Sequence, residues 1–305
     1  MSESADVLAI DCGRSGSSWS ISGSGFAAGA APGVDPGRPI EPQIAELARA
    51  ALTESGRRPG TLACASAALR RPDAAATLAD LLDTPITRVR LADDSVTKYL
   101  GALADSDGVL IACGTGVVAL AVGGAEVARV DGWGWLMGDA GSAYWIGRNA
   151  LEAAMRGYDG RRQSTALTEL LQDDFDDIEI AHLELQADPD RVARVASYAA
   201  KVDEAAQTDP VARSILDKAA AHLAEAVVAA AHRVGLGRHE APRVCAVGGT
   251  FESGRIRERF VAYLAMTWPG FALTPPLGDR LHGTQRLAVL DGGPLASLVV
   301  TASRN

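Results

Sequence analysis

Three short apolar runs in the sequence each end in a turn that contains glycine and a hydroxyl side chain. The runs are residues 7–10, 109–112 and 244–247, and the turns that follow them are Asp11-Cys12-Gly13-Arg14-Ser15, Gly114-Thr115-Gly116 and Gly248-Gly249-Thr250. Glycine lets backbone amides approach phosphate oxygens without a side chain in the way. A carboxylate at a strand end, here Asp11, can hold Mg²⁺, usually through water. The three turns together indicate a site for the phosphates of a nucleotide.

Each of these turns alone is weak evidence, because glycine is also common in tight hairpins. Three of them in order, each after an apolar strand, are much less expected by chance. The sequence has no G-x-x-x-x-G-K-[ST] pattern and no G-x-G-x-x-G after its first strand. The P-loop and the dinucleotide-binding fingerprint are therefore excluded.

Two adjacent carboxylates, Asp93 and Asp94, stand between a predicted strand at 86–91 and a predicted helix at 96–104. A carboxylate at such a junction, here Asp94, can serve as a general base, a group that accepts the proton of an attacking hydroxyl. Asp93 could be the base instead, since alternation at a strand end turns only one of the two toward a cleft. The competing structural role for Asp94 is that of a helix N-cap. A third carboxylate, Asp139, precedes a predicted helix at 142–155 and would interact favourably with its dipole.

These residues are positioned by an α/β chain that repeats one plan. Each half opens with a strand, a glycine turn and a returning strand, and the second half adds several alanine-rich amphipathic helices. We expect residues 1–112 to form an N-terminal lobe, joined by a C-terminal helix at 290–305. Residues 113–289 would form the C-terminal lobe.

Composition narrows the class of protein. The chain has 305 residues, 48% of them hydrophobic, and a net charge of −9. A nucleic-acid binder would normally carry a basic surplus, so nucleic acid is not an expected partner. The N-terminal segment lacks a signal-peptide core, and the apolar runs fall short of a membrane span. We expect a cytoplasmic protein with no membrane partner.

The four cysteines are far apart in the sequence and form no metal-binding spacing. They are Cys12, Cys64, Cys113 and Cys245, and most lie in apolar, strand-like segments. This placement is typical of buried, reduced thiols.

The longest informative motif is residues 132–147, Gly-Trp-Gly-Trp-Leu-Met-Gly-Asp-Ala-Gly-Ser-Ala-Tyr-Trp-Ile-Gly. With the three glycine turns in order, it resembles the N-acetylglucosamine kinase group, that is, the BadF/BadG/BcrA/BcrD ATPase family. That family is part of the sugar-kinase/Hsp70/actin superfamily. The pattern expected there is roughly GGWG-x-x-x-GDEGS-x-x-WI, and the resemblance extends from Val7 to about Val300.

The resemblance implies a two-lobed actin-like ATPase (ribonuclease H-like) fold, each lobe a mixed five-stranded sheet with flanking helices. ATP, Mg²⁺ and an amino sugar would bind in the cleft between the lobes, and the protein could be a homodimer. The reaction would be phosphorylation of N-acetylglucosamine or glucosamine at the 6-hydroxyl, with Asp94 as the base. By position, the ATP-binding residues would be Asp11, Gly13, Ser15, Gly114, Thr115, Gly116, Gly248, Gly249 and Thr250. The sugar would contact Asp139, Ser66, Asp35 and Gly134.

Three positions depart from the family pattern. Cys12, Arg14 and Gly16 replace residues of the usual D-G-G-G-T-K loop, Val117-Val118 follow the second turn, and Ala140 replaces the glutamate of GDEGS. These departures favour one alternative, a catalytically impaired sensor of sugar or nucleotide. The same family also contains ATPases that activate dehydratases. That activity would need closely placed cysteines for a shared iron-sulfur cluster, and the scattered cysteines of this sequence disfavour it.

Overall fold

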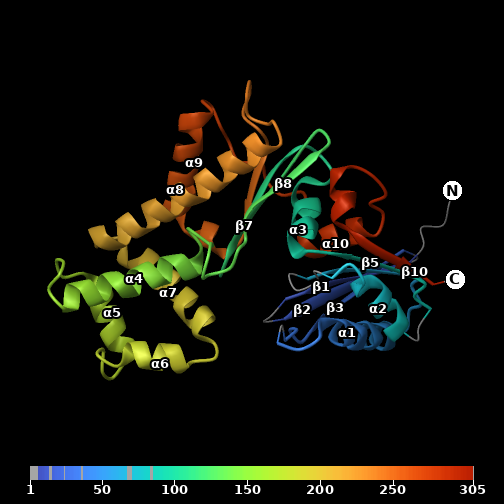
Figure 1. Ribbon diagram of the computed structural model, residues 1–305, viewed down its shortest axis with the longest axis horizontal. Coiled ribbons are helices and arrows are strands. Elements are labelled where there is room, and N and C mark those ends of the chain that lie inside the picture. Colours follow the sequence, from blue (N-terminus) through green and yellow to red (C-terminus); the bar gives the residue numbers. More distant parts are fainter. Residues whose placement is uncertain are drawn as a thin grey trace. The chain divides into compact units, whose positions relative to one another are not determined.

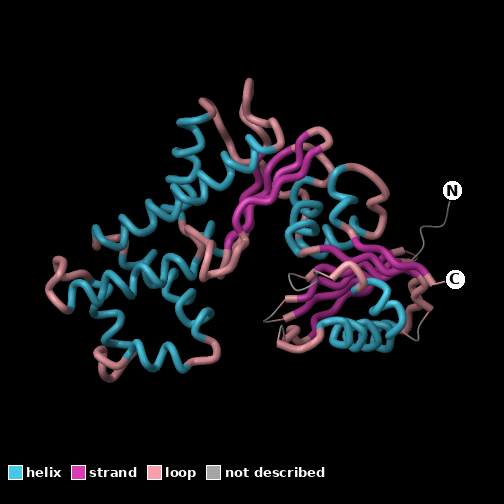
Figure 2. The backbone as a smooth tube through the Cα atoms, viewed as in Figure 1, coloured by secondary structure: helices cyan, strands magenta, loops and turns pink. Residues whose placement is uncertain are grey.

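The computed structural model describes residues 6–13, 16–23, 25–35, 37–66, 71–82 and 85–304. These residues form two compact units, each with its own sheet and flanking helices (Figure 1). The first unit comprises residues 1–107, 124–127 and 275–305, and the second comprises residues 108–123 and 128–274. Helices make up most of the second unit (Figure 2).

The sheet of the first unit has six strands in the order β10-β5-β4-β1-β2-β3. The central strands β1, β4 and β5 are parallel, whereas β2, β3 and β10 pair antiparallel to their neighbours. The strand bounds are β1 Val7–Cys12, β2 Ser17–Ser22, β3 Ala27–Ala31, β4 Thr61–Ala65, β5 Arg88–Ala92 and β10 Val300–Ser303.

Helices cover both faces of this sheet. Helices α1 (Ile40–Ser55) and α2 (Ala74–Leu81) lie on one face, and α3 (Asp94–Leu103) and α10 (Arg280–Leu287) lie on the other (Figure 1). Every residue of β1 is consequently buried. This explains why its sequence is a continuous apolar run rather than an alternating one, as parallel strands covered on both faces require.

Helices α3 and α10 pack backbone against backbone. A Cβ atom on Gly283 would lie 1.8 Å from the carbonyl oxygen of Thr97, and one on Gly101 would lie 2.2 Å from the carbonyl oxygen of Asp279. The amides of Leu277 and Gly278 add hydrogen bonds to carbonyls of α3. The start of α10 is therefore held against the C-terminal half of α3, and Gly283 packs near the middle of that helix.

The second unit contains a four-stranded sheet in the order β8-β7-β6-β9, in which β6 and β9 are parallel. Helix α8 packs on β6 and β7 and against α9, while α4 packs on α7. Asp209 caps α8 and Pro210 occupies its first turn, as expected for a helix start. The bounds are β6 Gly108–Cys113, β7 Val117–Gly123, β8 Glu126–Asp131, α4 Ala143–Tyr158, α5 Ala166–Asp174, α6 Ala181–Ala187, α7 Arg191–Ala205, α8 Pro210–Arg233, β9 Val244–Val247, η1 Gly249–Glu252 and α9 Gly254–Thr267.

The expectation of five strands in each lobe was wrong in both units. In the first unit, β10 adds a sixth strand. In the described part of the second unit, the segment after α9 makes one backbone hydrogen bond to β9, from Thr274 N to Val244 O. Pro275 and Pro276 follow directly, and proline has no amide to continue a ladder.

The expected C-terminal helix at 290–305 was also wrong. Gly292, Gly293 and Pro294 interrupt the segment, a short 3₁₀ helix (η2, Pro294–Leu298) follows, and the chain ends in β10. Strand β10 covers the otherwise open edge of β5. Residues 275–289, expected in the C-terminal lobe, belong to the first unit because α10 packs on α3 and β1.

The prediction of buried, reduced cysteines is confirmed, since all four thiols are free and buried. The Sγ atoms of Cys12 and Cys64 lie 3.7 Å apart on neighbouring strands. Hydrogen bonding with Cys12 and burial raise the pKa of Cys64 well above its usual value, and burial raises the pKa of Cys113 to about 12. In the described part of the chain, no helix combines the length and apolarity that a bilayer crossing needs.

The close contact of α3 and α10 predicts that Gly283→Ala destabilises the protein. The new methyl group has no space beside Thr97, so the helices must separate, which should cost about 1–3 kcal/mol or more of unfolding free energy. Gly292→Ala is the control, because a Cβ there meets nothing within 4 Å. Urea unfolding followed by circular dichroism should show a lower midpoint for Gly283→Ala only. Equal midpoints for the two variants would contradict the packing described.

Candidate functional site

Polar side chains of the first unit collect where its parallel strands end. Asp11 lies near the end of β1, Ser66 directly follows β4, and Asp93 directly follows β5. The strand register aligns Asp11 with Ala65 and Ala65 with Ala92, so these strands end at the same edge. The carboxyl edge of parallel strands is where ligands of open α/β sheets bind. The structure thus brings three sequence-predicted positions together.

The two adjacent aspartates at this edge, Asp93 and Asp94, have different partners. Asp93 is the N-cap of α3, and its Oδ1 accepts hydrogen bonds from the amide of Ser95 at 3.0 Å and its hydroxyl at 2.5 Å. Asp94 is the first residue of the helix, and its Oδ2 lies 2.5 Å from Nζ of Lys98, one turn later. The capping role considered for Asp94 therefore belongs to Asp93.

Asp11 is a buried carboxylate in a cluster of alternating charges. Its Oδ2 lies 3.3 Å from Nη1 of Arg280, while its own side chain is only 3% exposed. Burial raises the pKa of Asp11 above its usual value, and Arg280 and Lys98 oppose that rise. Asp94 contributes to the rise through its negative charge. The carboxylates of Asp11 and Asp94 thus interact with each other and with two cations.

The loop after β3 joins this edge through the first glycine turn. The amide of Val34 donates to the carbonyl of Gly13 at 3.0 Å, and a Cβ on Gly13 would lie 2.5 Å from the carbonyl oxygen of Gly16. Asp35 follows in the loop, is exposed, and accepts a hydrogen bond from the amide of Gly37. Ser15, expected to bind phosphate, lies outside the described residues.

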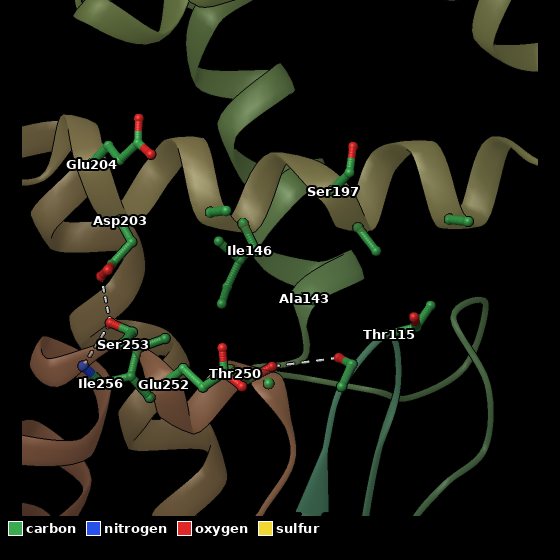
Figure 3. A pocket seen from close by; sticks show the side chains of 16 residues that line it. Thr115, Ala143, Ile146, Ser197, Asp203, Glu204, Thr250, Glu252, Ser253 and Ile256 are labelled. Atoms are coloured by element: carbon green, nitrogen blue, oxygen red, sulfur yellow. Dashed lines mark hydrogen bonds between the residues drawn. The ribbon is translucent and has the colours of Figure 1, made fainter. Parts of the chain in front are cut away.

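The second unit contains a pocket with a volume of about 570 Å³ (Figure 3). One side is α7, and the opposite side is the pair of glycine turns at the ends of β6 and β9. Figure 3 shows Asp203 directed toward Ser253, with which it forms a hydrogen bond, while Ser197 and Glu204 point away from Thr250. The lining residues are Gly114, Thr115, Ala143, Ile146, Ala193, Ala196, Ser197, Ala199, Ala200, Asp203, Glu204, Gly249, Thr250, Glu252, Ser253 and Ile256.

The glycines of the two turns fall into two kinds. A Cβ on Gly116 would lie 2.8 Å from a carboxylate oxygen of Asp139, and one on Gly248 would lie 2.1 Å from the carbonyl oxygen of Cys113. Packing within the chain therefore requires these two glycines. At Gly114 and Gly249 a Cβ would meet nothing within 4 Å, yet both residues line the pocket. A side chain there would extend into space that a ligand could use.

Hydrogen-bond donors are available at both turns. Within the described residues, no hydrogen bond uses the amides of Thr115, Gly116, Gly249 or Thr250. The Thr250 hydroxyl lies 3.5 Å from the Gly114 carbonyl oxygen and so connects the two turns. Amides in such a concave arrangement suit an anion.

Asp139 is buried beside the second glycine turn. Its Oδ1 accepts from the amide of Val117 at 3.2 Å, and its own amide donates to Asp131 at 2.8 Å. Burial raises the pKa of Asp139 above its usual value. Gly134 lies in an exposed turn before it, with a φ of +78°. Two expected sugar contacts, Asp139 and Gly134, are thus in the second unit, and the other two, Ser66 and Asp35, are in the first.

Sequence reasoning missed Arg280 and the α7 side of the pocket. Arg280 is 269 residues away from Asp11 in the sequence, in a segment for which no helix was predicted. Asp203 lies on α7, an amphipathic helix on which a carboxylate is normally solvated. Neither position carries a local motif, so only the fold shows its place.

Curated relatives match short parts of the chain. An N-acetylmuramic acid/N-acetylglucosamine kinase of Clostridium acetobutylicum is 31% identical over 81 residues, which are 26% of this chain and 26% of the relative. An N-acetyl-D-glucosamine kinase of Dictyostelium discoideum is 42% identical over 65 residues, 21% of this chain and 20% of the relative. The matched part is therefore about a quarter or a fifth of these relatives.

The fold matches over much more of the chain. The crystal structure of a candidate N-acetylglucosamine kinase from Chromobacterium violaceum superimposes with a TM-score of 0.73 and 22% identity, covering 93% of this chain and 99% of that one. This likeness shows that the chain shares the fold of that structure over nearly its whole length. A family model, moreover, matches residues 74–271, well over half of the chain. The chain belongs to the BadF/BadG/BcrA/BcrD ATPase family.

Proposed function

We propose that this protein is a kinase that transfers the terminal phosphoryl group of Mg²⁺-bound ATP to the 6-hydroxyl of an amino sugar, N-acetylglucosamine or glucosamine. Membership of an ATPase family and the names of the curated relatives support this proposal. The observation that carries it is the separation of roles at the start of α3. Asp93 caps the helix, which leaves the carboxylate of Asp94 for chemistry at the strand edge.

The nucleotide would bind the pocket of the second unit. Its volume of about 570 Å³ lies within the range of small-molecule sites, roughly 300–1,000 Å³. The amides of the Gly114–Gly116 and Gly248–Thr250 turns would donate to phosphate oxygens, and the alanine-rich face of α7 would pack against the base. Gly114 and Gly249 fit such a ligand because a Cβ at either position would occupy its space.

Mg²⁺ would be held at Asp11, through water. An oxygen ligand from a single carboxylate suits this ion, which keeps most of its water shell. When bound, Mg²⁺ would supply positive charge that neutralises the phosphates during transfer. Asp11 fits the role because it is a buried carboxylate at a sheet edge, and the cation that contacts it directly, Arg280, is itself largely exposed.

The acceptor hydroxyl would be oriented and deprotonated by Asp94. Phosphoryl transfer needs alignment of the hydroxyl with the phosphorus and a group to accept its proton. Lys98, at 2.5 Å, fixes the direction of the Asp94 carboxylate. We propose Ser66, Asp35, Asp139 and Gly134 as sugar contacts.

The dehydratase-activator alternative has no support from the cysteines. All four are buried in the strands of the two sheets, so none offers its sulfur to a cluster shared with another subunit. The sensor alternative differs from the kinase in one measurable property, because a sensor would bind nucleotide without turning it over.

Coupled ADP release should reveal turnover with Mg²⁺, ATP and either N-acetylglucosamine or glucosamine. The 6-deoxy analogue of the accepted sugar should give none, because it lacks the acceptor hydroxyl. Nucleotide binding by calorimetry without turnover on any amino sugar would instead establish the sensor function. Turnover of the 6-deoxy analogue would exclude the 6-hydroxyl.

Asp94→Asn should lower kcat by about 10²–10⁴, the usual effect of removing a general base. Asparagine keeps the size of the side chain, so sugar and nucleotide binding should change little. Asp93→Asn is the matched control and should be mild, because asparagine is an equally good N-cap. If Asp93→Asn abolishes turnover and Asp94→Asn does not, the base is Asp93.

Gly249→Ala should weaken nucleotide binding by about tenfold, the loss of one good contact, because its methyl group enters the pocket. Its melting temperature should stay unchanged or rise slightly, since alanine favours helix. Gly254→Ala is the control: a Cβ there also meets nothing within 4 Å, but Gly254 does not line the pocket. Equal Kd values for the two variants and the wild type would place the nucleotide elsewhere.

A further inference from the structure

Arg280 reaches from the protein surface to a buried carboxylate. Its side chain is 57% exposed, whereas the Asp11 side chain that it contacts is 3% exposed. The two groups meet at 3.3 Å, between Nη1 of Arg280 and Oδ2 of Asp11. Arg280 is the first residue of α10, which Asp279 caps. The guanidinium thus lies at the point where solvent meets the strand edge.

The position of Arg280 is set by the fold, although its side chain is exposed. The contacts of Gly283 with Thr97 and of Gly101 with Asp279 hold α10 against α3. Every conformation of the Arg280 side chain therefore starts from the same place, within reach of the Asp11 carboxylate. The Arg280 guanidinium is itself largely exposed, so it can move from Asp11 to a ligand provided that another cation compensates the buried carboxylate.

The other cation of the cluster, Lys98, is paired with Asp94. Lys98 forms a 2.5 Å ion pair with Asp94 within the same helix, and its side chain is 20% exposed. Arg280 has five donors in a planar fork, and the pair with Asp11 is made through one nitrogen. Under the proposed kinase function, a phosphoryl group has to approach a hydroxyl held by Asp94, and the other donors of the fork would bind its oxygens.

We propose that Arg280 is a phosphate-binding catalytic residue, which neutralises Asp11 in the empty protein and binds the terminal phosphoryl group of the nucleotide. The proposal rests on the proposed kinase function. Asp11 would hold Mg²⁺, which would supply the compensating positive charge, and the Arg280 guanidinium would then be available to phosphate oxygens with its charge and fork intact. An arginine fork matches phosphate oxygens and stabilises the charge on a transferring phosphoryl group.

Binding of nucleotides with and without the terminal phosphate tests this role. Calorimetry would measure Kd for Mg²⁺-ADP and for the Mg²⁺ complex of the non-hydrolysable triphosphate AMP-PNP, using full-length protein. Arg280→Gln should weaken AMP-PNP binding by about tenfold or more, the loss expected for a charge-assisted hydrogen bond. Its Kd for ADP should stay close to that of the wild type, since ADP has no terminal phosphate.

Arg286→Gln is the matched control on the same helix. Arg286 also pairs with a carboxylate, Asp105, at 3.7 Å, but it lies almost two turns from the start of α10. This variant should bind both nucleotides like the wild type. If Arg280→Gln does not fold, Arg280→Met replaces it, since methionine keeps part of the apolar stem without the charge.

Two results would overturn the assignment, and they are distinguishable. In the first, the wild type binds both nucleotides, and the variant that lacks the Arg280 charge keeps the same ratio of the two Kd values. Arg280 would then have only the role of neutralising Asp11. A wild type that binds neither nucleotide would refute the proposed kinase function, and the role of Arg280 with it.

Discussion

Parallel pairing between strands that are distant in the sequence decides which polar groups meet in each unit. In the first unit, β1, β4 and β5 pair in parallel, so Asp11, Ser66 and Asp93 end at one edge. In the second unit, β6 and β9 pair in parallel, and the turns at Gly114 and Gly249 end side by side. Both sets of polar groups follow from the same rule, since parallel strands present their carboxyl ends together. A one-residue shift in either pairing would turn these side chains to the other face.

Burying the ionised Asp11 carboxylate at the sheet edge of the first unit costs free energy. Burial raises the pKa of Asp11, so the folded state favours the protonated carboxyl. The corresponding stabilisation is present at acid pH, below the ordinary value, and is lost as the pH rises through the raised value. At neutral pH the ionised group therefore needs compensation, which Arg280 and Lys98 provide. A buried anion of this kind is a weak stabiliser and a good ligand for a cation.

Much of this arrangement could be predicted from the sequence, because its signals are local. An apolar run followed by a glycine turn identifies the ends of β1, β6 and β9, and their order resembles that of a known family. The choice between Asp93 and Asp94 could not be made, since both fit a strand-to-helix junction and only the geometry of Ser95 shows which one caps. Arg280 and β10 depend on contacts between residues some 200 positions or more apart, which no local pattern reveals.

The glycine motifs themselves combine two physical requirements that look alike in sequence. In Gly114-Thr115-Gly116, the last glycine makes room for the Asp139 carboxylate and the first borders open space. In Gly248-Gly249-Thr250, the first glycine has a φ of +106° and packs on Cys113, and the second borders open space. One glycine in each turn is therefore required by packing within the chain, and the other leaves the backbone of the turn accessible to a ligand. A structural glycine alone would give only a hairpin, and it is the second, unconstrained glycine that points to a ligand.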